Sequence, residues 1–341
     1  MRPLAALVVL ATLAIGCGDE AASSPDVGGA SDSLADVSHE PDVPTPQSDL
    51  AGAPDLPVNT EPLVYAPCPG STHVGGFQIT LADDYTGADG QVLDGIVPAN
   101  VPEEVQVDGA CRLLRAVSLY CEPACVPGET CGAEGACIPY PERSSVGLVT
   151  LTGLIDALSM EAKWGNTYTN PGSMTHPGYE PGADIGLTAD GGDFEAFSLR
   201  GFGVEALVVN GNSDVVVAAG TGISLSWSPP TVDGPVKVHI ELNLNNHGST
   251  SAWIACDAED TGSFTIPATL LDALYDIGVS GFPSLSMSRR SVDSASISPG
   301  CVDLMVVSEA EVPVEIDGIT SCTTNQQCPP GQSCGADLAC H

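Results

Sequence analysis

The chain has 341 residues and a formal net charge of −35, because 44 Asp and Glu residues oppose nine Lys and Arg residues. So acidic a surface repels the phosphates of nucleic acids, and we therefore exclude a nucleic-acid-binding protein. Hydrophobic residues make up 43% of the chain, which is enough for a sizeable core in one or two domains. The 38 glycines and 28 prolines favour many short strands over long helices.

Residues 1–16 have the pattern of an export signal. Arg2 is followed by a run of apolar or small residues from Leu4 to Ile15, which is too short to span a bilayer as a helix. The letters LAIGC at residues 13–17 resemble the lipobox of bacterial lipoproteins. The resemblance implies cleavage before Cys17 and its acylation, palmitate included. The alternative is an ordinary secretory peptide with an incidental cysteine.

This resemblance implies a lipid-anchored protein of the bacterial cell envelope, with the membrane as its partner through the acyl chains. In enteric bacteria an Asp after the lipidated Cys marks retention in the inner membrane. Gly18 occupies that place here, so we expect sorting to the outer membrane. The 13 cysteines support the lipid, because setting Cys17 aside leaves an even number that can pair in an oxidising compartment.

Residues 17–62 are predicted to be a disordered tether. From Gly18 to Pro62 the chain carries ten acidic residues, seven prolines and no Lys or Arg, and its apolar residues are isolated. Such a segment buries too little apolar surface to offset the entropy lost on ordering. We expect it to hold a folded body away from the membrane; the alternative is an acidic segment that binds cations or assists export.

Eight of the cysteines fall into two groups of four, which form an internal repeat. CVPGETCGAEGAC at residues 125–137 and CPPGQSCGADLAC at residues 328–340 agree at eight of thirteen positions. We expect two small disulfide-stapled modules, at residues 118–141 and 319–341. Zinc is the alternative, but the chain has no C-x2-C pair. The cysteines are Cys121, Cys125, Cys131 and Cys137 in the first module and Cys322, Cys328, Cys334 and Cys340 in the second.

The pattern C-x5-CPxGxxCGxxxxC resembles a short cysteine-rich repeat of exported proteins from myxobacteria and related deltaproteobacteria. It also resembles the cysteine-rich N-terminal region of Dickkopf proteins. These resemblances imply disulfide-bonded surface modules and no catalytic residue. The stretch from about Val64 to Ile316, with Trp-Ile-x-Cys followed by Asp-Thr-Gly-Ser, resembles lipoproteins of the same bacteria, and no activity follows from that likeness.

The rest of the chain has a hydrophobic period of two. Apolar and polar residues alternate strictly from Val236 to Leu244, and shorter segments of this kind recur about every ten residues. We predict a mainly β fold: an antiparallel β-sandwich body built from residues 63–117 and 142–318. One short helix between Pro267 and Gly278 is expected to cover an open end or edge of the sandwich.

Four cysteines in or beside predicted strands are expected to crosslink this body. Four cysteines allow three connectivities. Proximity in the sequence favours one bridge between Cys68 and Cys111 and another between Cys256 and Cys301.

No motif establishes an enzyme. Asp260-Thr-Gly-Ser has the letters of the aspartic-protease loop, in which two such aspartates share a proton, but the chain has no second copy. A β-turn explains the same residues. The six histidines form no metal-binding motif.

An acidic, turn-rich segment is a candidate calcium site, although it does not follow the EF-hand pattern. Its acids are Asp83, Asp84, Asp89 and Asp94. A solvated acidic loop is the alternative, and Asp257, Glu259 and Asp260 form a weaker second candidate. We predict no other cofactor.

Residues 163–182 form a Gly- and Pro-rich candidate ligand loop, because long loops with aromatic residues often bind partners. Its candidate contacts are Trp164, Tyr168, His176 and Tyr179. The alternative is a loop folded onto its own sandwich with the rings buried. The sequence thus predicts a membrane-anchored, non-enzymatic lipoprotein whose β-sandwich binds a protein or glycan at a surface. An exported hydrolase with a loop-built site and a structural envelope protein are the alternatives.

Overall fold

A computed structural model describes residues 61–211, 215–245 and 252–341. The predicted signal peptide, Cys17 and the tether up to residue 60 lie outside the described residues. The described chain is mainly β, as the sequence predicts, and contains one α-helix, α1 (Ala268–Ile277). Two 3-10 helices, η1 (Pro98–Asn100) and η2 (Asn325–Gln327), complete the helical part.

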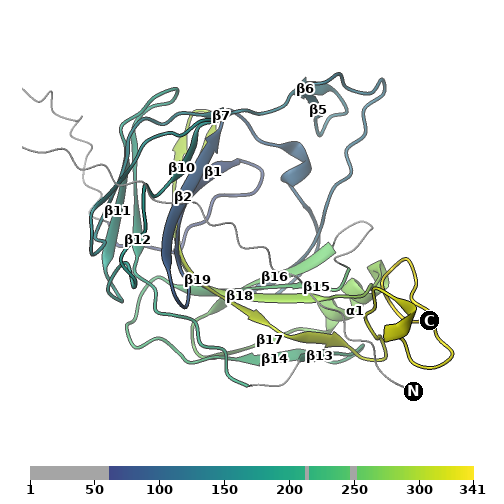
Figure 1. Ribbon diagram of the computed structural model, residues 1–341. Coiled ribbons are helices and arrows are strands. Elements are labelled where there is room, and N and C mark those ends of the chain that lie inside the picture. Colours follow the sequence, from purple (N-terminus) through teal and green to yellow (C-terminus); the bar gives the residue numbers. More distant parts are fainter. Residues whose placement is uncertain (1–60, 212–214, 246–251) are drawn as a thin grey trace, which may run out of the picture. The chain divides into compact units, whose positions relative to one another are not determined.

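The largest sheet has ten strands in the order β10-β2-β1-β19-β18-β15-β16-β4-β3, with β7 paired to β2 (Figure 1). All of its pairs are antiparallel except β1 with β19, which is parallel, so the predicted antiparallel body contains a mixed sheet. Its strands are β1 (His73–Leu81), β2 (Thr86–Leu93), β3 (Glu103–Asp108), β4 (Cys111–Arg115), β7 (Arg143–Ser144), β10 (Thr167–Thr169), β15 (Lys237–Asn243), β16 (Ala252–Glu259), β18 (Ser284–Ile297) and β19 (Gly300–Val312).

Four smaller sheets accompany the large one. A four-stranded sheet has the order β12-β11-β8-β9, and the pairs β13–β20, β14–β17 and β5–β6 form two-stranded sheets. Their strands are β5 (Glu129–Cys131), β6 (Cys137–Pro139), β8 (Val149–Thr152), β9 (Leu158–Met160), β11 (Asp184–Ala189), β12 (Phe197–Phe202), β13 (Val215–Val217), β14 (Ile223–Ser226), β17 (Ser263–Ile266) and β20 (Val314–Ile316).

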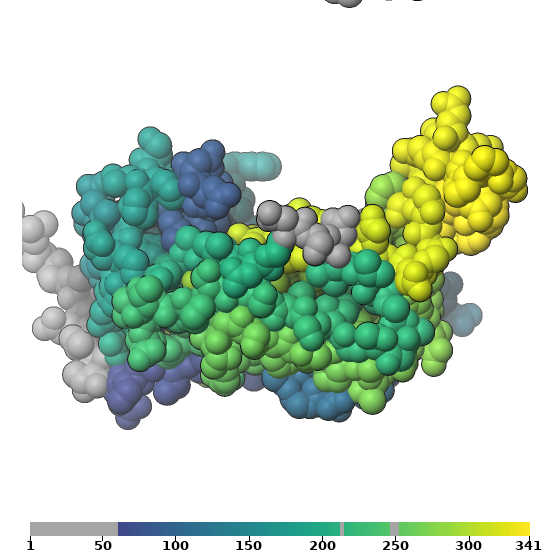
Figure 2. Space-filling view, turned by 90° about the horizontal axis from the view of Figure 1, so that it is seen from below, coloured from purple at the N-terminus to yellow at the C-terminus, as the bar shows by residue number. Residues whose placement is uncertain are grey.

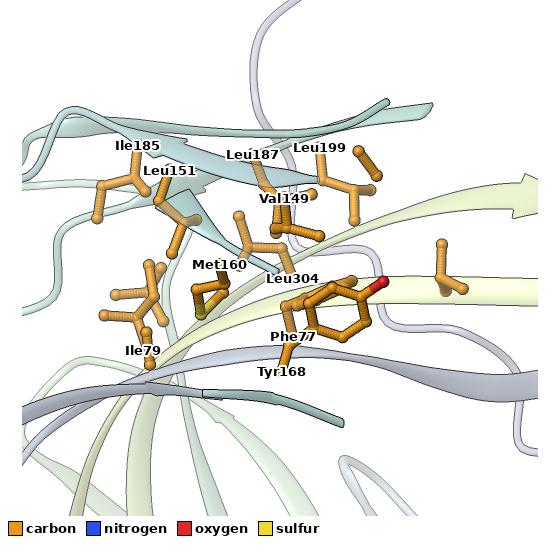
Figure 3. Close-up of a cluster of buried hydrophobic side chains, with 14 of the residues drawn as sticks. Phe77, Ile79, Val149, Leu151, Met160, Tyr168, Ile185, Leu187, Leu199 and Leu304 are labelled. Carbon is orange, nitrogen blue, oxygen red and sulfur yellow. The ribbon is translucent and has the colours of Figure 1, made fainter. Parts of the chain in front are cut away.

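The first hydrophobic core lies between β1 and β19 of the large sheet and the four-stranded sheet. Alternation along β1 directs Phe77 and Ile79 into this core. Figure 3 shows both side chains and Leu304 of β19 facing the four-stranded sheet. The labelled residues on the opposite side of the core are Val149, Leu151, Met160, Ile185, Leu187 and Leu199.

The second core lies under β15, β16 and β4 and is closed by β14, β17 and α1. The helix begins after Pro267, ends at Gly278 and buries Leu270, Leu271 and Leu274. It contacts β16, β4 and β3, the three strands at one end of the large sheet. The predicted helix therefore exists and covers the end of a sheet.

A buried ion pair links the parts of the second core. The Arg289 guanidinium on β18 donates from Nε and Nη2 to Asp260, at 2.6 and 3.1 Å, and the two side chains are 2% and 5% exposed. Trp227 Nε1 also donates to Asp260, at 2.6 Å. Arg289 Nη1 donates to the Ala206 carbonyl, and Nη2 also donates to the Ser228 carbonyl. Because each charge is paired and hydrogen-bonded, the network ties three separate segments to β18.

All twelve cysteines of the described residues form disulfides, but the sequence-based pairing of four of them is wrong. The bridges are Cys68–Cys301 and Cys111–Cys256. Cys111 stands directly opposite Cys256 in the β4–β16 register, and the parallel β1–β19 pair brings the chain near Cys68 to Cys301. Proximity in the sequence fails because both bridges join segments far apart in the chain, with sequence separations of 233 and 145 residues.

The two cysteine-rich modules share one connectivity, in which the first cysteine binds the third and the second binds the fourth. The bridges are Cys121–Cys131 and Cys125–Cys137 in the first module, and Cys322–Cys334 and Cys328–Cys340 in the second. Figure 2 shows the second module, in yellow, as a knob on the surface. Gly281 N donates to the Asp337 carbonyl and Phe282 N donates to Ser321 Oγ, and these two bonds attach the module to the rest of the chain.

Replacing Asp260 with Asn should destabilise the fold by roughly 3–5 kcal/mol, because the Arg289 charge stays buried without its counter-charge. Urea unfolding under oxidising conditions measures this change. Glu259→Gln is the matched control, since Glu259 is 74% exposed and pairs with Lys237 at the surface. Its expected cost is below about 1 kcal/mol. Equal stability of the two variants would contradict the structural importance of the buried pair.

Candidate functional site

The large sheet has a second side, which faces neither hydrophobic core and which we call the outer face. Alternation along β15 directs Val238, Ile240 and Leu242 into the second core and leaves Lys237, His239 and Glu241 on the outer face. The cross-strand register adds Asp257 and Arg112 from one side and Ser286, Ser288 and Arg290 from the other. These residues, with Tyr65 above them, form the outer-face cluster.

Asp257 is the centre of the outer-face cluster. Its Oδ1 accepts hydrogen bonds from the Tyr65 hydroxyl at 3.0 Å and pairs with His239 Nδ1 at 2.8 Å. Arg112 Nη2 donates to Oδ2 at 3.4 Å. Lys237 Nζ lies 5.7 Å from the centroid of the Tyr65 ring and pairs with Glu259. One carboxylate thus joins three strands and the segment that precedes β1.

These contacts shift three protonation equilibria. Burial raises the pKa of Asp257, but the hydrogen bond and charge of His239 and the hydrogen bond from Tyr65 outweigh it and lower that pKa to about 2. Burial, followed by the charge of Asp257, raises the pKa of Tyr65, so the phenol stays protonated and donates. Burial also lowers the pKa of the Arg290 guanidinium. Perturbed groups of this kind are concentrated at functional sites, although structural ion pairs also produce them.

Arg290 differs from the other cations of the cluster. Its Nε donates to Ser288 Oγ at 3.1 Å. Nη1 and Nη2 make no hydrogen bond to any described residue, and no described carboxylate lies within 4.0 Å of the guanidinium. Glu241 and Glu309 are near enough to act on its pKa without pairing with it.

Sequence reasoning missed this cluster. The alternation from Val236 to Leu244 correctly placed His239 away from the core, yet its side chain is only 15% exposed because Asp257 binds it. Which acid and which arginine flank it depends on the β15–β16 and β15–β18 pairings, and those join segments that the local pattern does not connect. Asp257 and Glu259 are each paired with cations, so the weaker calcium candidate that used them with Asp260 is not assembled.

The structure divides the candidate ligand loop into one exposed residue and two buried ones. Trp164 is 99% exposed, whereas Tyr168 and Tyr179 are 0% and 1% exposed. Tyr168 packs edge-on against Phe77, with ring centroids 5.5 Å apart, and its hydroxyl accepts from the Val146 N–H. Figure 3 labels both residues within the first core. Burial raises the pKa of Tyr179. These two rings support the core, as the alternative of a folded-back loop foresaw.

Three hydrogen bonds stabilise the turn that carries Trp164. Asn166 N donates to the Lys163 carbonyl at 2.9 Å, and Lys163 N donates to the Thr167 carbonyl at 2.8 Å. Asn166 Nδ2 donates to the Arg143 carbonyl at 2.8 Å. The fourth candidate, His176, does not join Trp164: its ring nitrogens contact Thr86 Oγ1 and the Asp83 carbonyl.

The acids of the calcium candidate are not brought together. Asp83 and Asp84 lie between β1 and β2, Asp89 lies in β2, and Asp94 follows β2 and accepts from the Glu142 N–H. Within the described parts of the chain, no group of three His, Cys, Asp or Glu ligand atoms within 4.8 Å of one another includes any of these four acids. Each of the groups that does meet this distance contains disulfide cysteines, which offer no thiolate.

The carboxylate of Asp260 has a structural role, because it is bound within the fold. It follows β16 in the turn before β17, where Gly262 has φ +94°, and its carboxylate is occupied by Arg289 and Trp227. The turn interpretation of the Asp-Thr-Gly-Ser letters is therefore confirmed, and the motif gives no support to an exported hydrolase. No helix among the described residues is long and apolar enough to span a membrane.

Comparison with known proteins assigns no family. The chain matches no family model and no curated protein. Among solved structures, one match is a chain from a study of host cell surface retention of a 1.5-MDa bacterial ice-binding adhesin. It is 12% identical, with 77% of this chain and 68% of that chain covered, and the TM-score is 0.17. A similarity this low carries no argument about fold or function.

Asp257→Asn should lower the free energy of unfolding at neutral pH by about 2 kcal/mol, since each unit of pKa shift corresponds to about 1.4 kcal/mol. Because the folded pKa is depressed, this stability is present above the usual value of 3.8 and is lost as the pH falls through about 2. Urea unfolding from pH 7 to pH 2 measures it. The variant should show a flatter pH profile below pH 4. Glu103→Gln, which breaks an exposed pair with Arg115, is the control. An unchanged profile in the Asp257 variant would contradict the assignment.

Proposed function

We propose that this chain is a lipid-anchored, non-enzymatic protein of the bacterial cell envelope whose β body binds a glycan at a surface. The lipobox-like sequence ending at Cys17 supports the anchor. The six disulfides suit a body exported to an oxidising compartment. We expect the anchor to lie in the outer membrane, with the acidic tether spacing the body from it.

The observation that carries the binding function is the exposure of Trp164. A fully exposed indole is unfavourable in water, and tryptophan is the residue most enriched among the energetic centres of binding sites. The three hydrogen bonds of its turn fix the backbone that carries the ring before a partner arrives, which lowers the entropy cost of binding. A flat ring on a rigid turn suits stacking against the C–H face of a sugar.

Trp164→Ala should weaken binding of the chain to its glycan at least tenfold, because truncation of a central aromatic contact costs more than about 1.4 kcal/mol. Binding is measured on intact bacterial cells and on a panel of immobilised neutral and acidic polysaccharides. Tyr120→Ala is the matched control, since Tyr120 is 86% exposed and lies in the first cysteine module. Equal binding by both variants would contradict the proposal. Loss of cell binding after protease treatment, with no polysaccharide bound, would favour a protein partner instead.

Cys17→Ser should move the protein from the membrane fraction to the soluble fraction, because the acyl chains can no longer be attached. Detergent phase partitioning and metabolic labelling with an alkyne palmitate measure the change. The labelled band should disappear in the variant and persist in Ser23→Ala, a control substitution in the same segment. A variant that still partitions with membranes and still carries the label would contradict lipidation at this residue.

A further inference from the structure

We infer that the part of the outer face between His239, Arg290, Glu241 and Glu309 is a binding site for a neutral saccharide. The inference deepens the proposed glycan-binding function and rests on it, but it uses other residues than the Trp164 turn. The site is assembled by three adjacent strands, β15, β18 and β19, so its side chains stand on a rigid floor.

The floor of the site is made of small residues. In the register of the sheet, Glu241 stands opposite Ser286, while Ser288 stands between His239 on β15 and Glu309 on β19. Ser286 is exposed, whereas Ser288 is 7% exposed beneath the larger side chains around it. The bond from Arg290 Nε to Ser288 Oγ draws the guanidinium over this floor, toward Glu309 and His239.

The walls of the site carry hydrogen-bonding groups with no protein partner. Arg290 Nη1 and Nη2 offer four N–H groups, and His239 Nε2 is open because Asp257 binds only Nδ1. Glu241 and Glu309 are exposed acceptors that hydrogen-bond to no described residue. Donors and acceptors thus stand on the same face of three adjacent strands without satisfying one another. A ligand whose groups both donate and accept satisfies both sides, and sugar hydroxyls do so.

The local charge selects against an ionic ligand. Arg290, Lys237 and Arg112 contribute three positive charges, and Asp257, Glu259, Glu241, Glu309 and Glu311 contribute five negative ones. An anion would meet this surplus of carboxylates within a chain of net charge −35. A cation would meet the partly desolvated Arg290 guanidinium. A neutral ligand avoids both penalties.

An aromatic wall completes the site. The Tyr65 hydroxyl is fixed by Asp257, and Lys237 lies over its ring, so the ring is held across β15 beside Arg290. Saccharide sites combine a few placed polar groups with a ring that packs against the sugar. Tyr65 supplies that ring without a further ordering cost on binding.

The test is calorimetric titration of the full chain with neutral oligosaccharides derived from dextran, galactomannan and β-glucan, and with polygalacturonate and dextran sulfate as acidic probes. The wild type should bind at least one neutral oligosaccharide. Arg290→Gln should weaken that binding about tenfold or more, because it leaves the ligand hydroxyls with fewer and uncharged donors. Glu309→Gln, an exposed change that keeps the shape, should also weaken it and remains informative if Arg290→Gln does not fold.

The control is Arg115→Gln on β4, which removes a cation that leaves the sheet on its other side and pairs with Glu103. Its affinity should equal that of the wild type. A preference for the acidic probes, or equal affinities in the Arg290, Glu309 and Arg115 variants, would overturn the site. Cell binding that depends on Trp164, with no neutral oligosaccharide bound, would overturn this inference and leave the proposed function standing. Absence of both would overturn both.

Discussion

Both hydrophobic cores depend on one hairpin, formed by β18 and β19. Its register runs without a break from Leu285 opposite Val312 to Ile297 opposite Gly300. Leu285 and Met287 enter the second core, and Ile297 enters the first, at positions of the same parity along β18. The two cores therefore cover the same side of the hairpin, and the opposite side becomes the outer face. A slip of one residue would exchange the two sides along the whole sheet.

The side chains of Asp257 and Asp260 point to opposite sides of the large sheet, because one lies within β16 and the other follows it. Asp257 lies within β16, where the period of two directs it to the outer face and to His239. Asp260 lies beyond the strand end, where the turn directs it inward to Arg289. The buried pair of Asp260 stabilises the second core, and the half-buried Asp257 organises the outer-face cluster. Three residues of separation thus place one carboxylate inside the second core and the other on the outer face.

The sequence predicted the elements that local pattern determines. The alternation from Val236 to Leu244 became β15, and the stripe after Pro267 became α1, because side-chain period alone reports which face is buried. It could not predict the parallel β1–β19 pair, since parallel neighbours come from distant segments. The disulfide pairings failed for the same reason. Local pattern could not divide the candidate ligand loop into buried and exposed rings, because burial of Tyr168 depends on its contact with Phe77 two strands away in the same sheet.

Because the chain has few positively charged residues, their positions are informative. The chain has only nine Lys and Arg residues, and an acidic body needs few of them for solubility. Arg289 is used inside, where it compensates Asp260. Arg112, Lys237 and Arg290 are gathered on the outer face, and two of these three are paired with carboxylates there. Arg290 alone of the three keeps its terminal nitrogens without a described acceptor, while carboxylates stand nearby but apart. If Arg290 served only to compensate charge, its terminal nitrogens would pair with one of these carboxylates. The unpaired donors therefore favour a ligand whose hydroxyl groups bind both Arg290 and the carboxylates.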